Sequence, residues 1–471
     1  MSAEIILENE IGAIEAPAGC GKTQLIVEAL AIPPVKPYLV LTHTTAGVAA
    51  LRKRLTRANV PAKNYVLSTI DGWSVRIASS FSQNCQIASP VENSRTYYPE
   101  LRNAVSSYLA TGSLHEVIRA SYSRLIVDEY QDCNQEQHNI VCSISQCIPT
   151  TVLGDPMQLI FNFRGTQIPS WQAEVLNYFP LLTELNTPWR WINAQNQELG
   201  EWVLECRRRL AAGNNIDLTH SPNSVSHIQL SQNHQENMRL KSTAQYQLRN
   251  AYPQDSLLVI GNSINANSRH LYASQNNGID VVEPVDLRDL VTFSERLDVE
   301  LGEQLATCVI NIFGSLATGM GSSHWVPRIR TILAGRNRNA PSLTEAAIIV
   351  FIQSKTAANF LAIMNTVETD DNIRVYRRAA FSALKSAINS VVCEPSLSFK
   401  QGMERARESL RQRGDTRIPN LAIGSTLLLK GLEADHSLII DVSNMNSQNL
   451  YVALSRGAKT ISIASSATAL P

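Results

Sequence analysis

Residues 14–23 read I-E-A-P-A-G-C-G-K-T and lie near the start of the 471-residue chain. Apolar residues precede this stretch and the helix-forming run 24–30 follows it, so its context is strand, glycine turn, helix. Gly19 and Gly21 allow backbone N–H groups to curl around a phosphate, and the following helix presents its positive end to the anion. The pattern predicts an α/β fold with a phosphate-binding loop.

Residues in and beside this loop carry the expected chemistry. Lys22 would reach the β- and γ-phosphate oxygens, and the Thr23 hydroxyl would hold Mg²⁺. The alternative is a chance glycine turn between a strand and a helix, since one residue departs from the G-x-x-x-x-G-K-[ST] pattern. The departure is alanine in place of the first glycine. The predicted nucleotide-binding residues are Ala16, Pro17, Ala18, Gly19, Cys20, Gly21, Lys22 and Thr23.

A second segment supports nucleotide chemistry. Residues 123–137 read S-R-L-I-V-D-E-Y-Q-D-C-N-Q-E-Q, an apolar strand that ends in paired carboxylates. Open α/β sheets bind their ligands at strand ends. Asp128 would complete the Mg²⁺ coordination, and Glu129 is placed to orient or deprotonate an attacking water. The alternative, acids that only cap the next helix, is disfavoured by the phosphate loop.

The run D-E-Y-Q-D followed by N-x-x-Q resembles motif II of the UvrD/Rep group of superfamily 1 helicases. The first motif of that group also accepts alanine at the position of Ala16. The resemblance implies two RecA-like cores, each a parallel sheet flanked by helices, with ATP and Mg²⁺ bound between them. Residues 1–13 contain no glutamine of the kind with which the family reads adenine, so adenine selectivity stays open.

Two further segments resemble the DNA-contacting motifs Ia and Ib. Residues 38–55, Y-L-V-L-T-H-T-T-A-G-V-A-A-L-R-K-R-L, look like motif Ia, and residues 66–73, V-L-S-T-I-D-G-W, are similar to motif Ib. Asp71 stands where the family commonly has histidine, and an acid there would repel DNA phosphate. Trp73 either stacks on a base or fills the core. The matching DNA-contact residues are Thr42, His43, Thr44, Thr69 and Trp73.

Residues 151–165, T-V-L-G-D-P-M-Q-L-I-F-N-F-R-G, resemble motif III. Gln158 matches the γ-phosphate sensor. Phe161 and Phe163 match aromatics on which the family stacks successive bases, and Arg164 follows them as a further DNA contact. Without the resemblance, two phenylalanines in an apolar strand would be assigned to the core.

The last three motifs supply the remaining site residues. Residues 185–200, L-N-T-P-W-R-W-I-N-A-Q-N-Q-E-L-G, look like motif IV, although tryptophans flank the arginine. Residues 424–435 and 449–460 resemble motifs V and VI. The resemblance implies two arginine fingers, Arg190 and Arg456, and stacking on a neighbouring tryptophan is the alternative for the first. It also implies that Glu433 holds the ribose and that Lys430 and Gly431 lie near DNA and nucleotide.

Composition is that of an ordinary soluble protein, with 44% apolar and 17% charged residues and a formal net charge of zero. No run of eighteen apolar residues and no signal sequence is visible, so a cytoplasmic protein without a membrane partner is expected. The eight cysteines show no C-x-x-C pairing and are expected to be reduced. Basic clusters at 207–209, 328–338, 374–378 and 405–417 are each interpreted as solvated helix faces.

Motif positions predict the domain organisation. The first RecA-like core comprises residues 1–73 and 121–184, with a small insertion at 74–120. The second comprises 185–284 and 400–471, with a mainly helical accessory domain at 285–399.

Two functions are compatible with this organisation. The first is an ATP-dependent translocase or helicase that moves 3′ to 5′ on single-stranded or partly duplex DNA. The second is a DNA-end-sensing ATPase subunit that controls a partner nuclease of the OLD/TOPRIM type, as in Gabija-type anti-phage systems.

Overall fold

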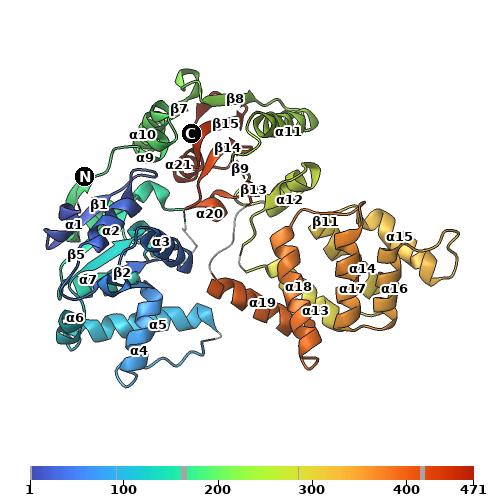
Figure 1. Cartoon of the computed structure of the whole chain (residues 1–471), viewed down its shortest axis with the longest axis horizontal. Helices are drawn as coiled ribbons and strands as arrows, with labels where there is room; N and C mark the ends of the chain where they lie inside the picture. The colour runs from blue at the N-terminus through green and yellow to red at the C-terminus, as the bar shows by residue number, and fades with distance from the viewer. Residues whose placement is uncertain (1–2, 92, 161–166, 285, 414–418) are drawn as a thin grey trace. The chain divides into compact units, whose positions relative to one another are not determined.

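The computed structural model describes residues 3–91, 93–160, 167–284, 286–413 and 419–471. The chain forms two compact units (Figure 1). Unit 1 comprises Met1–Val225, Met445–Thr460 and Thr468–Pro471, and unit 2 comprises Ser226–Asn444 and Ile461–Ala467. Unit 1 therefore extends beyond residue 184, where the sequence places the end of the first core.

Unit 1 is built on a six-stranded sheet with the order β3-β2-β4-β5-β1-β6, in which all neighbouring strands are parallel. Its interior strands β2, β4 and β5 are buried along their whole length, which explains their continuous apolar sequence. The strands are β1 (Ile11–Glu15), β2 (Tyr38–Thr42), β3 (Tyr65–Thr69), β4 (Leu125–Asp128), β5 (Thr150–Gly154) and β6 (Leu181–Glu184).

Helices cover this sheet, and polar side chains cap several of them. Thr44, Thr69 and Asn134 each accept a backbone N–H at the start of a helix, and Asn134 forms a full capping box with Gln137. The main helices are α1 (Glu4–Leu7), α2 (Lys22–Ala31), α3 (Thr45–Arg57), α4 (Ile70–Ser80), α5 (Ser94–Ala110), α6 (His115–Ser121), α7 (Gln135–Ser145), α8 (Leu176–Tyr178), α9 (Trp189–Asn193), α10 (Gln197–Ala211) and α21 (Ser447–Leu454).

Helix α5, in the segment predicted as a small insertion, packs against α4 and α7 rather than standing apart. Its side chains Leu101, Val105 and Leu109 are fully buried in the same cluster as the sheet residues Leu39 and Val127. The insertion thus shares the hydrophobic core of the first sheet.

A second six-stranded sheet has the order β10-β13-β9-β14-β15-β8, and β10, β13, β9 and β14 run parallel. Two sheets of this kind, flanked by helices, are two RecA-like α/β cores, which confirms the predicted fold class. The strands are β8 (Val225–Gln229), β9 (Leu257–Ile260), β10 (Asp280–Val281), β13 (Leu421–Gly424), β14 (Ala434–Ile439) and β15 (Gly457–Ser465), and the accompanying helices are α11 (His234–Ala251), α12 (Ala266–Gln275) and α20 (Thr426–Leu429). Two short ribbons pair β11 (Ala317–Thr318) with β12 (Arg374–Val375), and β7 (Ile216–Asp217) with β16 (Ala469–Leu470).

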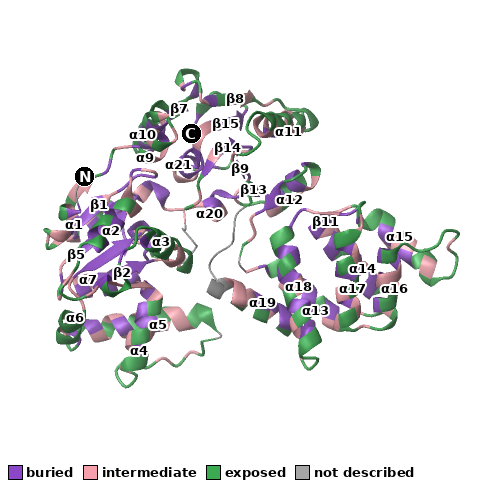
Figure 2. Ribbon diagram, viewed as in Figure 1, coloured by how far each residue is buried: buried purple, intermediate pink, exposed green. Residues whose placement is uncertain are grey.

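The remaining helices of unit 2 form a bundle with its own apolar core, visible as a buried interior in Figure 2. Phe313, Phe351 and Phe360 are fully buried there. Helix α19 packs against α13 and α18, so the bundle continues past residue 399, where the sequence places its end. The helices are α13 (Arg288–Val299), α14 (Gly302–Leu316), α15 (Ser322–Leu333), α16 (Leu343–Gln353), α17 (Ala357–Thr369), α18 (Arg378–Cys393) and α19 (Phe399–Arg413).

Among the described residues, no helix has both the length and the apolar character needed to cross a membrane. All eight cysteines are free thiols that take part in no disulfide. In the same part of the chain, no group of three His, Cys, Asp or Glu side chains is arranged to hold a metal ion.

Candidate active site

The loop between β1 and α2 has the backbone that its glycines predict. Gly19 and Gly21 have φ of +74° and +91°, in the left-handed region that favours glycine. A Cβ at Gly19 would lie 2.7 Å from the ring of Trp191, so a larger residue would not fit. The Ala16 N–H donates to the Gly154 carbonyl at 2.8 Å and fixes the loop to the end of β5.

Lys22, the first residue of α2, meets both predicted catalytic acids. Its Nζ lies 2.8 Å from Asp128 Oδ1 and also pairs with Glu129 Oε1. Burial alone would lower the pKa of Lys22, but the two carboxylates outweigh it and raise that pKa, so the ammonium stays charged. Burial raises the pKa of Asp128, and the Lys22 charge opposes that rise. Thr23 follows Lys22 in the first turn of α2.

Glu129 is held in an unusual backbone conformation, with φ of +55° directly after β4. Such a conformation in a non-glycine residue costs free energy and is common at functional sites. The Gln131 amide donates to Glu129 Oε2 at 2.6 Å and accepts the backbone N–H of Asp155 at 2.9 Å. Gln131 therefore ties the predicted catalytic acid to the end of β5.

Asp155 lies at the centre of a buried network. Its Oδ2 accepts from the Gln158 amide at 2.9 Å, and its Oδ1 accepts from Arg207 Nε at 3.0 Å. Arg207 also pairs with Glu15 and, at 3.0 Å, with Glu184. The hydrogen bond from Gln158 to Asp155 fixes the position of Gln158, the predicted γ-phosphate sensor.

Arg207 corrects one sequence-based interpretation. The sequence predicts a solvated helix face for the cluster 207–209, yet the Arg207 side chain is only 6% exposed, whereas that of Arg208 is 68% exposed. A second cluster, 374–378, contains a similar exception, because Arg377 is 2% exposed and pairs with Glu283 and Asp289. In both cases acids from distant segments surround the arginine.

The two predicted arginine fingers lie at one place in unit 1. The Arg190 backbone N–H donates to the Gly19 carbonyl at 3.1 Å, and its guanidinium donates to the Ser455 carbonyl. The Arg456 guanidinium donates to the Ser455 hydroxyl at 2.6 Å. Arg190 also lies 5.4 Å from the centroid of the Trp191 ring, as the stacking alternative predicted. Arg190 therefore contacts the phosphate loop, and both arginines contact Ser455.

The predicted DNA-contact residues of motifs Ia and Ib lie at one sheet edge. Thr42 ends β2 and is in register with Thr69 at the end of β3 and with Asp128 at the end of β4. The Thr44 and Thr69 hydroxyls accept backbone N–H groups at the starts of α3 and α4, so both have a structural role as helix caps. The Thr42 hydroxyl is buried and has no hydrogen-bond partner among the residues that the structure describes. His43 lies between these threonines and is partly buried.

Trp73 does not have the exposure that base stacking requires. Its side chain is 0% exposed and belongs to the core cluster of unit 1, so the structure supports the core alternative. Asp71, the unexpected acid nearby, is neutralised by Arg102 of α5 through contacts of 2.7 and 2.6 Å. Asp71 Oδ1 also accepts from Gln137 at 3.0 Å. The α5 helix thus supplies the countercharge for motif Ib.

Several predicted residues cannot be placed beside this site. Phe161, Phe163 and Arg164 lie outside the described residues. Lys430, Gly431 and Glu433 belong to unit 2, where Lys430 is the C-cap residue directly after α20 and Gly431 has φ of +81°. Their roles remain those that the resemblance implies.

One aromatic residue at the loop was not singled out from the sequence. Trp189 is 49% exposed, and a Cβ at Gly21 would lie 3.0 Å from its ring. It therefore places a half-exposed apolar surface beside the phosphate loop. The signal in the sequence is the W-R-W run at 189–191, in which the tryptophans are weighed only as stacking partners of Arg190.

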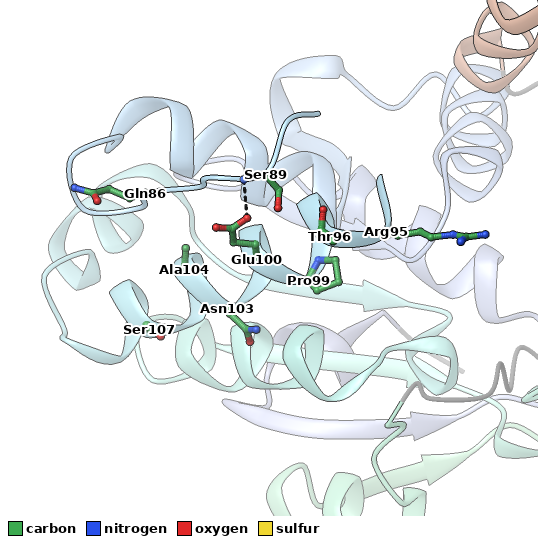
Figure 3. A pocket seen from close by; sticks show the side chains of 9 residues that line it. All are labelled: Gln86, Ser89, Arg95, Thr96, Pro99, Glu100, Asn103, Ala104 and Ser107. Atoms are coloured by element: carbon green, nitrogen blue, oxygen red, sulfur yellow. Dashed lines mark hydrogen bonds between the residues drawn. The ribbon is translucent and has the colours of Figure 1, made fainter. Parts of the chain in front are cut away.

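A separate open hollow lies beside α5 (Figure 3). Glu100 there accepts the backbone N–H groups of Ala88 and Ser89 at 2.8 and 2.9 Å, and these bonds lower its pKa. None of the residues that line the hollow belongs to the phosphate loop or to its partners.

Part of the chain is similar to known helicase proteins. Residues 91–175, which include Asp128, Glu129, Asp155 and Gln158, match the family model of the UvrD/REP helicase N-terminal domain. This segment therefore resembles the N-terminal domain of UvrD/REP helicases. The chain is also 35% identical, over 83 residues, to the RecBCD enzyme subunit RecB of Buchnera aphidicola subsp. Schizaphis graminum (strain Sg). That match covers 17% of this chain and 7% of the RecB chain.

A solved structure described as a complex of Arterivirus nonstructural protein 10 (helicase) with DNA is 8% identical, with a TM-score of 0.35. The alignment covers 98% of this chain and 63% of the viral chain.

Proposed function

We propose that this protein hydrolyses ATP in unit 1 and uses the reaction to move 3′ to 5′ on single-stranded DNA. The observation that carries the proposal is the convergence of Lys22, Asp128 and Glu129 at a left-handed glycine loop. A loop of this kind followed by lysine suits phosphate binding, and adjacent carboxylates at a strand end suit hydrolysis.

The residues present fit Mg²⁺ and a nucleoside triphosphate. Asp128 and Thr23 supply oxygen ligands of the kind that Mg²⁺ prefers, and Lys22 supplies a cation for phosphate oxygens. Bound Mg²⁺ would neutralise charge on the phosphates. Because Lys22 already pairs with Asp128 and Glu129, an incoming phosphate must share this ammonium with them.

Four further side chains have roles in the proposed hydrolysis of ATP. Glu129, held by Gln131, orients the attacking water and accepts its proton. Gln158, held by Asp155, contacts the γ-phosphate. Arg190 and Arg456 stabilise the charge that develops on the transferring phosphoryl group, a contribution of about 10³ to 10⁵ in rate for an arginine finger.

Trp189 is proposed to bind the nucleotide base. Its half-exposed ring lies against Gly21, where the base of a nucleotide held by the loop can stack on it. Stacking provides affinity but little discrimination between bases, so other nucleoside triphosphates are also expected as substrates.

DNA binding is proposed for the edge of the first sheet that carries Thr42, His43, Thr44 and Thr69. Phe161, Phe163 and Arg164 are proposed as further DNA contacts on the strength of the resemblance alone. The register of β2 with β4 brings the Thr42 end of this edge beside Asp128. This adjacency supports coupling between DNA contact and hydrolysis.

The test compares Glu129→Gln with the exposed-site control Glu116→Gln, whose wild-type side chain is 87% exposed. Glu129→Gln should still bind a fluorescent ATP analogue but lose about 10² to 10⁴ in hydrolysis rate, the usual contribution of a general base. Glu116→Gln should match the wild type. Hydrolysis retained in Glu129→Gln would contradict the assigned role.

A further inference from the structure

Tyr451, in α21, occupies a position that the proposed mechanism does not use. Its side chain is fully buried, and its hydroxyl makes two contacts within unit 1. The oxygen accepts the backbone N–H of Ala18, in the phosphate loop, at 2.8 Å. The same hydroxyl donates to Asp155 Oδ2 at 3.0 Å.

Asp155 in turn holds the predicted sensor. Its Oδ2 also accepts from Gln158 at 2.9 Å, while its Oδ1 accepts from Arg207 at 3.0 Å. The Tyr451 hydroxyl therefore joins the phosphate loop to Gln158 through one shared carboxylate oxygen. Burial raises the pKa of Tyr451 well above its usual value, so the hydroxyl keeps the proton that it donates.

We propose that Tyr451 is a positioning residue that sets Gln158 relative to the phosphate loop, an inference that rests on the proposed ATP hydrolysis. A hydroxyl can accept and donate at the same time, which no apolar side chain can do. Tyr451 acts through Asp155 and does not itself contact the nucleotide. Its hydroxyl accordingly contributes to the rate of hydrolysis rather than to nucleotide affinity.

The test is Tyr451→Phe, which removes the hydroxyl and keeps the ring. The expected result is a fall of about tenfold in kcat, the scale of one lost positioning hydrogen bond, with KM for ATP within about twofold of wild type. The control is Tyr272→Phe, since Tyr272 is 1% exposed and its hydroxyl donates to the Lys241 carbonyl at 3.2 Å. This control should keep the wild-type kcat.

A double variant tests whether the effect passes through the sensor. If it does, adding Tyr451→Phe to Gln158→Ala should lower kcat no further, because the sensor is already absent. Independent multiplication of the two effects would overturn the proposal. An unchanged kcat, an effect confined to KM, or loss of folding in Tyr451→Phe would also overturn it, since position and not stability is assigned to the hydroxyl.

Lys22→Ala separates this inference from the proposed function. Wild-type hydrolysis that does not exceed the Lys22→Ala blank would refute the function itself. Lys22-dependent hydrolysis with a normal Tyr451→Phe would refute only the role of Tyr451.

Discussion

Replacing Arg207 with alanine should destabilise unit 1 strongly. The guanidinium donates to Asp155 and Glu184, both at 3.0 Å, and pairs with Glu15. The Asp155 and Glu15 side chains are only 0% and 14% exposed, so water cannot replace the lost cation for them. Glu184, at 50% exposed, can be hydrated again.

The magnitude follows from this burial. Removing one partner of a buried ion pair costs about 3–5 kcal/mol, because a charge is left uncompensated. For a domain of about 150–250 residues, each kcal/mol shifts the melting temperature by about 2–4 °C, so a shift of about 6–20 °C is expected. The neighbouring Arg208→Ala is the matched control. Arg208 is 68% exposed and pairs with Glu205 on the surface, a contact worth about 0–1 kcal/mol.

The assay is scanning calorimetry of the full-length variants at neutral pH and fixed salt, with circular dichroism to confirm the starting fold. Arg207→Ala should melt well below both wild type and Arg208→Ala. Equal melting temperatures for the two variants would refute the reasoning, since they would show that the buried carboxylates do not depend on Arg207.

Three further outcomes are expected. Arg102→Ala removes the partner of Asp71 and should raise amide hydrogen exchange across residues 94–110. The control Arg119→Ala breaks an exposed pair and should leave that exchange unchanged. Equal exchange in the two variants would contradict the assigned contact between Arg102 and Asp71. Burial, and after it the charge of Arg377, lowers the pKa of His270 to about 4. On acidification His270 therefore takes up a proton at a higher pH in the unfolded chain than in the folded chain, and the free energy of unfolding should fall from pH 6.5 toward pH 4. In urea titrations at pH 7 and 4.5, His270→Asn should lose less stability on acidification than wild type, and an identical loss would exclude His270 as the cause. Trp189→Ala should raise KM for ATP by about tenfold at little changed kcat, on the scale of one lost stacking contact, and an unchanged KM would remove Trp189 from the base site.

The fold class was predictable because its signals are local. The glycine loop lies between β1 and α2, and the paired acids end β4, so short segments carry both elements. Continuous apolar runs predict buried parallel strands without knowledge of their neighbours. The N-x-x-Q pattern after the acids is likewise local, since Asn134 and Gln137 form the capping box of α7.

The parts that were not predictable depend on contacts between distant segments. Arg207 is separated by 192 residues from Glu15 and by 52 from Asp155, so its burial cannot be inferred from the R-R-R run. The choice between core and base stacking for Trp73 depends on α5, which packs against α4. Helical periodicity also cannot show where a bundle ends, which is why α19 extended past the predicted boundary.

The measurement that tests the central claim most directly is ATP hydrolysis by the purified full-length protein with and without single-stranded DNA, with Lys22→Ala as the blank. We predict hydrolysis that requires Lys22 and rises strongly when DNA is added. Hydrolysis that is indifferent to DNA would contradict a DNA motor and favour a subunit controlled by a partner. Turnover equal to the Lys22→Ala blank would contradict the assignment of the phosphate loop itself.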